Sequence, residues 1–257
     1  MSVVLLANTV WHDAAQIKPT DSSDVDTTDT STAQSVVGGQ RHLYWAQSGT
    51  ADRKLVYVNK AGNLNCSHVV VADAINHSGH TLKVVTYSGY TASPTTQYDS
   101  GSSFSGPYVG KQSKDFVYAL ASRVTNQQAI ALSLEAGSGG NWAKTVTKFY
   151  ACDGLTFNYP GVASYRPLAF PSRHSYKRNF FLVDEEYKLY FDAVSRADKE
   201  TFERLPNLMG EPVFLYDSAG GLLPDKLLHG IITAVEVSAR FDDLYRIDIT
   251  LNTLRPV

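Results

Sequence analysis

The sequence predicts an all-β protein, with an N-terminal β-sandwich followed by a small antiparallel split β-barrel that carries one short helix. Two observations predict this class. From residue 43 onward, short segments rich in Val, Ile, Thr and Tyr are separated by Gly, Ser, Asn and Pro, which favour turns. Several segments alternate apolar with polar residues, and no apolar stripe of helical period runs for ten residues or more.

Residues 1–42 are expected to form an N-terminal arm and a polar loop. An apolar start at residues 3–6 precedes a stretch, residues 20–37, in which nine of 18 residues are Ser or Thr and four are Asp. Such a stretch buries too little apolar surface to offset the entropy lost on ordering. It is therefore a surface loop, or an arm that a neighbouring subunit orders, and the sequence leaves both interpretations open.

Residues 43–160 are predicted to form the sandwich. In the segment 129–135, Ile130 and Leu132 fall on one face and Ser133 on the other, as expected of a strand. Seven short strands over about 110 residues are typical of a β-sandwich. The predicted strands are residues 43–46, 55–59, 68–75, 82–87, 116–121, 129–135 and 145–151.

Residues 161–257 are predicted to form the barrel. Its first hairpin is expected from residues 180–184 and 187–194, with the acidic run Asp184-Glu185-Glu186 as a solvated turn. The same carboxylates are an alternative candidate for acid–base chemistry, although the turn fits the flanking strands better.

One helix and three further strands complete the predicted barrel. Ser195 caps the helix, Phe202 and Leu205 form its apolar face, and Pro206 ends it because its ring cannot continue the hydrogen-bond ladder. The strands are residues 212–216, 229–237 and 244–251. In the last of them Tyr245, Ile247, Ile249 and Leu251 alternate with Arg246, Asp248 and Thr250.

Charge and hydropathy exclude several classes of function. A net charge of −2 gives no broad basic face for nucleic acid. The longest apolar runs are far shorter than the roughly 20 residues that span a bilayer, and residues 1–15 lack Lys and Arg, so we expect synthesis in the cytoplasm. Charged residues make up 14% of residues 1–160 but 27% of residues 161–257. The higher charge content of residues 161–257 suits polar contacts between subunits.

The sequence contains no recognisable catalytic, cofactor or metal motif, so we predict a protein that is not an enzyme and binds no cofactor. His77 and His80 share a loop, but no third ligand is close to them in the sequence. Cys66 and Cys152 have no ligand spacing either, and two buried thiols are favoured over a disulfide.

A tyrosine-rich segment supplies the candidate contact residues Tyr90, Tyr98 and Tyr108, which lie among Ser, Thr and Gly. Exposed Tyr in such loops gives contact area at low entropic cost, and its ring can stack on a sugar face. The alternative interpretation is that these rings cover the ends of the sandwich.

Two regions resemble known structural proteins. Residues 68–72, 81–87 and 142–159 are similar to the discoidin-like, galactose-binding-like sandwich of bacteriophage tail-tip proteins. Residues 211–217, 229–233 and 245–251, with their strand, G-x-I strand and final alternating strand, resemble the split β-barrel of tail-tube and distal tail proteins.

The resemblance implies a structural virion protein of a tailed bacteriophage, made in the host cytoplasm and assembled into the tail. Its barrel would join copies into a ring at the distal tail or baseplate and meet other tail proteins, while the sandwich projects outward. The alternative is a host-recognition adhesin whose sandwich binds a surface glycan through Tyr90, Tyr98 or Tyr108. A glycoside hydrolase is disfavoured.

Overall fold

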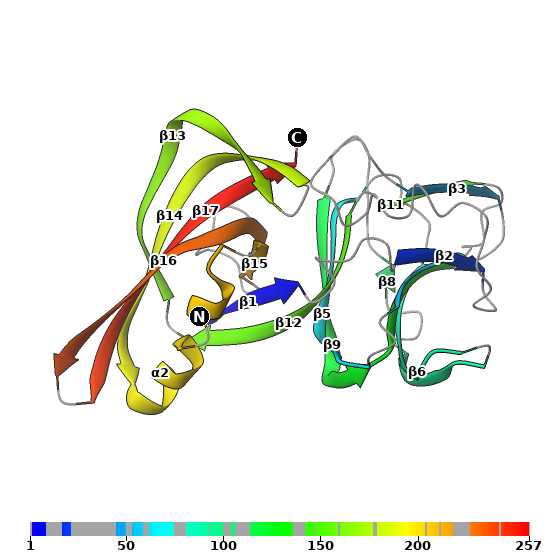
Figure 1. The fold of residues 1–257 in the computed structure, drawn as a ribbon, viewed down its shortest axis with the longest axis horizontal. Coiled ribbons are helices and arrows are strands. Elements are labelled where there is room, and N and C mark those ends of the chain that lie inside the picture. Colours follow the sequence, from blue (N-terminus) through cyan, green and yellow to red (C-terminus); the bar gives the residue numbers. More distant parts are fainter. Residues whose placement is uncertain are drawn as a thin grey trace. The chain divides into compact units, whose positions relative to one another are not determined.

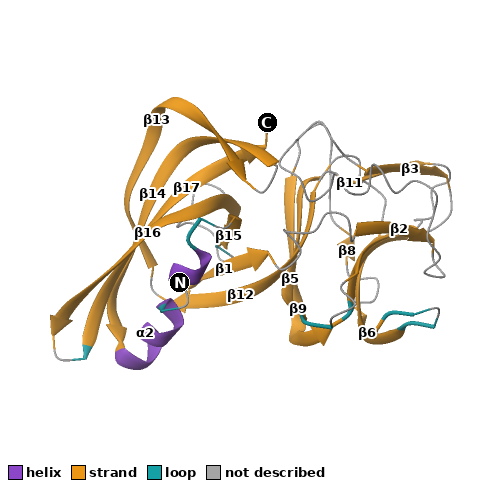
Figure 2. Cartoon of the chain, in the orientation of Figure 1, coloured by secondary structure: helices purple, strands orange, loops and turns teal. Residues whose placement is uncertain are grey.

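The chain is almost entirely β-structure in its computed structural model (Figures 1 and 2). The described helical elements are the short helix α2, Arg196–Phe202, and the 3-10 turn η3, Leu205–Leu208. The predicted all-β class is confirmed. The structure describes residues 2–8, 17–21, 45–49, 53–58, 62–74, 81–91, 93–99, 104–105, 114–135, 142–146, 148–158, 160–176, 179–203, 205–210, 212–217, 227–241 and 243–256.

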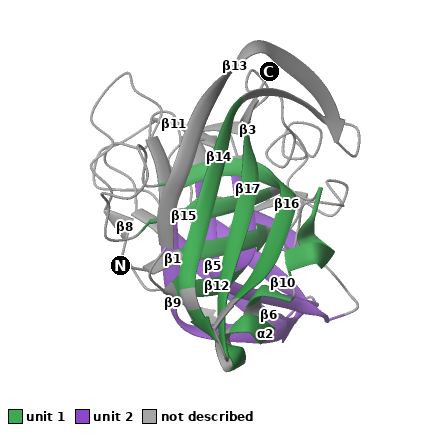
Figure 3. Cartoon of the chain, turned by 90° about the vertical axis from the view of Figure 1, so that its left-hand side faces the viewer, with its two compact units in different colours: residues 1–8, 154–257 green, residues 9–153 purple. Residues whose placement is uncertain are grey.

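The chain divides into two compact units (Figure 3), unit 1 with residues 1–8 and 154–257, and unit 2 with residues 9–153. The chain start belongs to unit 1 because strand β1, Ser2–Asn8, pairs antiparallel with β15, Pro212–Tyr216. Residues 22–44 lie outside the described residues, so an arm there stays a prediction, as does the division of the chain at residues 42 and 160.

Unit 1 is built on an antiparallel sheet with the strand order β13-β14-β17-β16-β15-β1. Its described strands form an open path and no closed barrel, which corrects the narrower expectation of a barrel. The end strand β13 carries Pro167 and Pro171, which lack the backbone N–H that a further strand would need. The other bounds are β13 Pro160–Tyr176, β14 Asn179–Ser195, β16 Leu227–Phe241 and β17 Leu244–Pro256.

The predicted hairpin over residues 180–194 is wrong, because β14 runs through it as one strand. Its pairing with β17 shifts register between Val183 and Glu186, so the acidic run lies at an irregularity inside the strand. A β-bulge accommodates extra residues without turning the chain back. The polar run that indicated a turn in the sequence is therefore the site of a β-bulge within β14.

The core of unit 1 joins the sheet to α2. The rings of Phe157, Phe191 and Phe202 pack together, with centroids 4.4 to 5.5 Å apart. Phe202 of α2 and Leu205 of η3 are both buried. The prediction that the helix includes Leu205 and ends at Pro206 is wrong, because α2 ends at Phe202 and both residues lie in η3. Ile247, Ile249 and Leu251 of β17 are buried too, which confirms the predicted alternation.

Unit 2 has a sandwich-like arrangement of strands. One group has the order β12-β5-β9, the other β2-β4-β10-β6-β7 with β8 beside β6, and β3 pairs with β11. Strands β6 and β9 come from different groups and contact each other. The bounds are β2 Ile17–Asp21, β3 Trp45–Gly49, β4 Arg53–Val58, β5 Leu64–Ala74, β6 Thr81–Gly89, β7 Thr95–Asp99, β8 Phe104–Ser105, β9 Lys114–Gln127, β10 Ala129–Glu135, β11 Trp142–Val146 and β12 Lys148–Asn158.

Strand β10 is the centre of the second group, between β4 and β6. Ile130 and Leu132 share one face and are at most 1% exposed, but Ser133 on the opposite face is also buried, at 3%. Burial on both faces follows from the central position, which alternation alone does not reveal.

Candidate functional site

Tyr90 is a partly buried residue directly after β6. Its backbone N–H donates to Oε1 of Gln128 at 2.8 Å, and its ring lies 5.3 Å from that of Tyr87. The same ring packs against the cluster that contains Val56 and Val85. Tyr90 is therefore held to the sheet, in the way that a ring covering the end of a sandwich would be.

The structure leaves the grouping of the three candidate tyrosines open. Tyr98 lies on β7 opposite Thr86, but its side chain is outside the described residues, as is the whole of Tyr108. Tyr87, from the same segment, is only 2% exposed and accepts a hydrogen bond from Nζ of Lys54 at 3.2 Å. Its ring is therefore part of the core and is not offered to a ligand.

The two cysteines are free and fully buried on the neighbouring strands β5 and β12. Burial raises the pKa of Cys66 to about 12 and holds the pKa of Cys152 well above its ordinary value. A nucleophilic cysteine needs a thiolate at neutral pH, which these groups do not provide. The prediction of two buried thiols is confirmed.

Beside the cysteines, Arg123 of β9 forms a bidentate ion pair with Asp153 of β12, at 2.6 and 2.8 Å. The hydrogen bonds to this carboxylate raise the pKa of Arg123, while burial lowers the pKa of His68. A bidentate guanidinium–carboxylate pair is geometrically specific, and this one joins β9 to β12 across β5, which lies between them. This pair therefore has a structural role at the surface of unit 2.

The acidic run on β14 does not form a pair suited to acid–base chemistry. Glu185 and Glu186 are neighbours on an extended strand, so their side chains point to opposite faces. Glu185 Oε2 accepts a hydrogen bond from the hydroxyl of Tyr187 at 3.5 Å. Among the residues that the structure describes, no three His, Cys, Asp or Glu side chains gather as a metal site.

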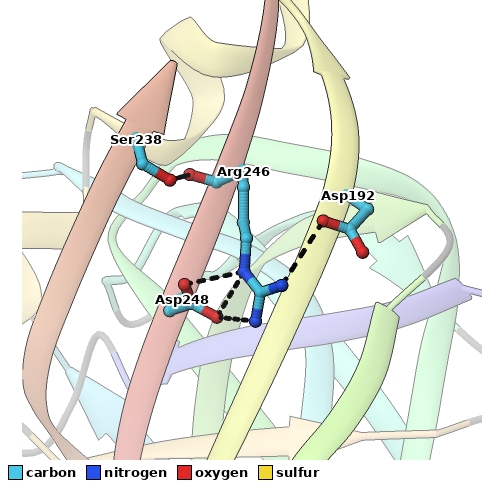
Figure 4. Close-up of polar contacts among 4 residues, drawn as sticks. All are labelled: Asp192, Ser238, Arg246 and Asp248. Carbon is cyan, nitrogen blue, oxygen red and sulfur yellow. Dashed lines mark hydrogen bonds and ion pairs between the residues drawn. The ribbon is translucent and has the colours of Figure 1, made fainter. Parts of the chain in front are cut away.

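A polar cluster crosses three strands of unit 1 and is centred on Arg246 of β17 (Figure 4). Its Nε and Nη2 donate to the Asp248 carboxylate at 3.0 to 3.1 Å, and its Nη1 lies 3.8 Å from Oδ1 of Asp192 on β14. The hydroxyl of Ser238 on β16 donates to the backbone oxygen of Arg246 at 3.4 Å. We call these four residues the Arg246 cluster.

The Arg246 cluster orders one face of the sheet electrostatically. The bonds to Asp248 raise the pKa of Arg246, and its guanidinium lies 5.2 Å from the ring of Tyr190. Glu236 of β16 lies opposite Asp248 in register, where two carboxylates would repel each other, and Arg246 pairs with Asp248 there. The result is a preorganised polar face.

The cluster could in part be found from the sequence. The alternation of β17 places Arg246 and Asp248 on the polar face, two residues apart. Asp192 could not be assigned to the cluster from the sequence. Which residue of β17 it lies beside depends on the β14–β17 register and on the shift between Phe191 and Val194.

A cavity of about 320 Å³ lies beside this sheet, between α2, η3 and β16. Phe202, Pro206, Val235 and Val237 form its apolar lining. Two further lining residues, Lys199 and Glu203, form an ion pair of 3.2 Å along α2. Val237 is 50% exposed, so the cavity opens next to an uncovered apolar side chain.

The same part of β16 has an uncovered backbone edge. Strand β15 pairs with residues 227–231, and Met209 bridges to Ile232. From Thr233 onward, no strand in the described part of the chain pairs with β16 on the side away from β17. The candidate functional site is this edge, together with the cavity and the Arg246 cluster beside it.

Comparison with known proteins adds no assignment: no family model, curated protein or solved structure matches this chain. Within the described ranges, none of the helices is both long and apolar enough to cross a membrane.

Proposed function

We propose that this chain is a structural protein of a tailed bacteriophage, a subunit of the ring at the distal tail or baseplate. Unit 1 makes the contacts between subunits through its sheet edge and α2, and unit 2 supplies the outward surface. Its role is assembly, without catalysis and without a cofactor.

The observation that carries this proposal is the uncovered edge of β16 from Thr233 onward, beside the cavity under α2. An exposed strand edge is a template for pairing with another chain, and proteins that stay monomeric usually block it. A ring gives every such edge a partner. The tail assignment is supported by the resemblance of residues 211–217, 229–233 and 245–251 to distal tail proteins.

The chemistry of the described residues also favours assembly over catalysis. The thiols are protonated and buried, and the ordered charged groups are paired with one another at the Arg246 cluster and at Arg123–Asp153. Charged pairs at a subunit contact give specificity more than affinity.

The assembly proposal is tested on the purified full-length chain by light scattering and negative-stain microscopy. Rings or defined oligomers are the expected result, and a stable monomer of 28.2 kDa at every concentration would contradict it. The phage assignment is tested by the gene's neighbours: a tape-measure gene beside it is expected, and a neighbourhood without tail genes would contradict the assignment.

A second candidate function is glycan binding by unit 2, favoured by Tyr90, a partly exposed residue that precedes the exposed Thr91 and Ser93. Millimolar or tighter binding to a host polysaccharide is expected, with loss on Tyr90→Ala. Tyr98→Ala and Tyr108→Ala test the other two candidate residues. A blank glycan array with the wild-type chain would leave unit 2 with an architectural role only.

A further inference from the structure

The uncovered edge of β16 carries a charge pattern that is complementary to itself. We infer that residues 235–241 pair antiparallel with the same residues of a second copy, about a two-fold axis at Ser238. This inference deepens the proposed function and rests on it in one respect, that the β16 edge is a subunit contact. It holds with or without the assignment to a phage tail.

The edge is accessible for pairing. In the described part of unit 1, β15 ends its pairing at Ile231 and the bridge from Met209 ends at Ile232. The hydroxyls of Thr233 and Ser238 donate back to carbonyl oxygens of β17, at 3.3 and 3.4 Å. Neither side chain therefore reaches across the edge to cap it.

The sequence of this edge also lacks the usual protection against pairing. Residues 233–239 contain no Pro and no Lys, and end in the small residues Ser238 and Ala239. The opposite end of the unit 1 sheet differs, because β13 carries Pro167 and Pro171, which cannot donate to a new strand. Pairing of β16 with β13 of another copy is therefore disfavoured, and pairing of β16 with itself is favoured.

Two residues of opposite charge select the register. The exposed Glu236 and the residue Arg240 are four positions apart on β16, and Arg240 falls where the β17 register shifts, so it has no opposite residue on β17. With the axis at Ser238, Glu236 of each copy lies opposite Arg240 of the other, which gives two ion pairs. Opposite charges placed across a strand pair stabilise it, and like charges destabilise it.

The neighbouring registers lack this complementarity. With the axis at Glu236, the Glu236 carboxylates of the two copies lie opposite each other and repel. With the axis at Val237, Glu236 lies opposite Ser238 of the second copy, and no ion pair forms. An axis midway between two residues would shift the pairing by one position and place apolar side chains on the wrong face. Charge therefore favours the axis at Ser238.

The pairing also covers an apolar side chain that the monomer exposes. A strand added to β16 lies about 4.8 Å away, and in this register Ala239 of the second copy is opposite Val237, which is 50% exposed. Val237 also lines the cavity under α2, so the added strand narrows its opening.

Such a contact is isologous and closes at two copies. A ring that uses it must therefore contain an even number of subunits and a second kind of contact elsewhere. An odd-numbered ring in negative stain, with every subunit in the same contact, would overturn the inference.

The test is charge reversal on the full-length chain, with the dimer dissociation constant measured by sedimentation equilibrium. Glu236→Arg or Arg240→Glu alone creates two like-charge pairs and is expected to raise that constant about tenfold. The double variant restores the two ion pairs in reverse and is expected to return to the wild-type value. Lys188→Glu, exposed on β14, which β17 separates from β16, is a matched control expected to have no effect.

A cross-linking experiment tests the axis itself and does not depend on the reversals folding. Opposite residues of an antiparallel pair have Cα atoms about 4.5 to 5.5 Å apart, within disulfide range. Ser238→Cys is therefore expected to give a disulfide-linked dimer on mild oxidation, whereas Thr233→Cys, far from the axis, is not. Cys66 and Cys152 are buried and give no background.

Three results would overturn the inference: a monomeric wild-type chain, single reversals that leave the dimer unchanged, or a double variant as weak as the singles. An oligomer that survives both reversals contradicts this pairing and leaves the assembly role standing. A dimer that depends on the charges but never joins tail proteins contradicts the tail assignment and leaves the pairing standing.

Discussion

Gly230 offers the sharpest test of how unit 1 is packed. It lies on β16 between Val213 of β15 and Thr253 of β17. A Cβ added there would lie 2.7 Å from the backbone oxygen of Asn252 and 2.8 Å from Cγ of Leu251. A side chain can rotate away from such a contact, but the backbone oxygen of a strand paired on both sides cannot. We therefore expect Gly230→Ala to strain the sheet.

The size of the effect follows from two opposing terms. Where the backbone conformation is compatible, Gly→Ala stabilises by about 0.4 to 1 kcal/mol because the unfolded chain loses freedom. Overpacking a closely packed core costs about 1 to 3 kcal/mol. The net expectation for Gly230→Ala is a fall of about 1 to 2 kcal/mol in the free energy of unfolding.

The assay is urea unfolding, with the midpoint and slope compared between variants. Gly89→Ala is the matched control, because its added Cβ would meet the nearest atom, Oγ1 of Thr95, at an ordinary 3.6 Å. The control is expected to be neutral or slightly stabilising. If the midpoint of Gly230→Ala equals that of the wild type, or is lowered no more than that of Gly89→Ala, the expected strain between β16 and β17 is contradicted.

Three further outcomes are expected. Burial raises the pKa of Cys66 to about 12, whereas in the unfolded chain it is about 9. The stability that the Cys66 thiol contributes is therefore complete below pH 9 and is lost as the pH rises toward 12. Cys66→Ala should accordingly flatten the fall of the urea midpoint at alkaline pH. Arg246→Ala should lower that midpoint more at low salt than at about 1 M salt, where charges are screened. Tyr90→Ala should cost about 1 kcal/mol in unfolding free energy through loss of its contact with Tyr87, and Tyr90→Phe much less.

The sequence predicted elements wherever a strand has one buried face. The alternation of Ile247, Ile249 and Leu251 places β17 correctly, because that face alone meets the core. The start of the helix after Ser195 was predictable too, and Phe202 is buried on it as expected, but Leu205 and Pro206 lie in η3, beyond its end.

The sequence failed where pairing with distant segments overrides local composition. No strand is predicted over residues 160–176, but β13 covers them as an end strand of the unit 1 sheet, where the missing N–H of a proline is tolerated. The run Asp184-Glu185-Glu186 indicated a turn, but pairing with β17 extends β14 through it. The partner strand β17 is not adjacent to β14 in the sequence, so no local pattern shows that β14 continues through the acidic run.

The candidate site shows the same division between local and long-range information. The residues that carry it are visible in the sequence, because Glu236, Arg240 and Arg246 lie on predicted strands or next to them. Their role depends on β15 ending its pairing at Ile231 while β16 continues to Phe241, a difference in length between paired strands. An uncovered edge is thus a property of the pairing, and it becomes apparent only when the register is known.

The two exposed edges in unit 1 then acquire different meanings. Pro167 and Pro171 remove two backbone donors from β13, whereas β16 past Ile232 keeps its donors and acceptors and adds a charge pattern that matches its own reverse. A protein that had only to avoid aggregation would protect both edges. Proline at one edge and charge complementarity at the other are what the proposed pairing of two copies through β16 requires, and they support the proposal of assembly through unit 1 over a monomeric role.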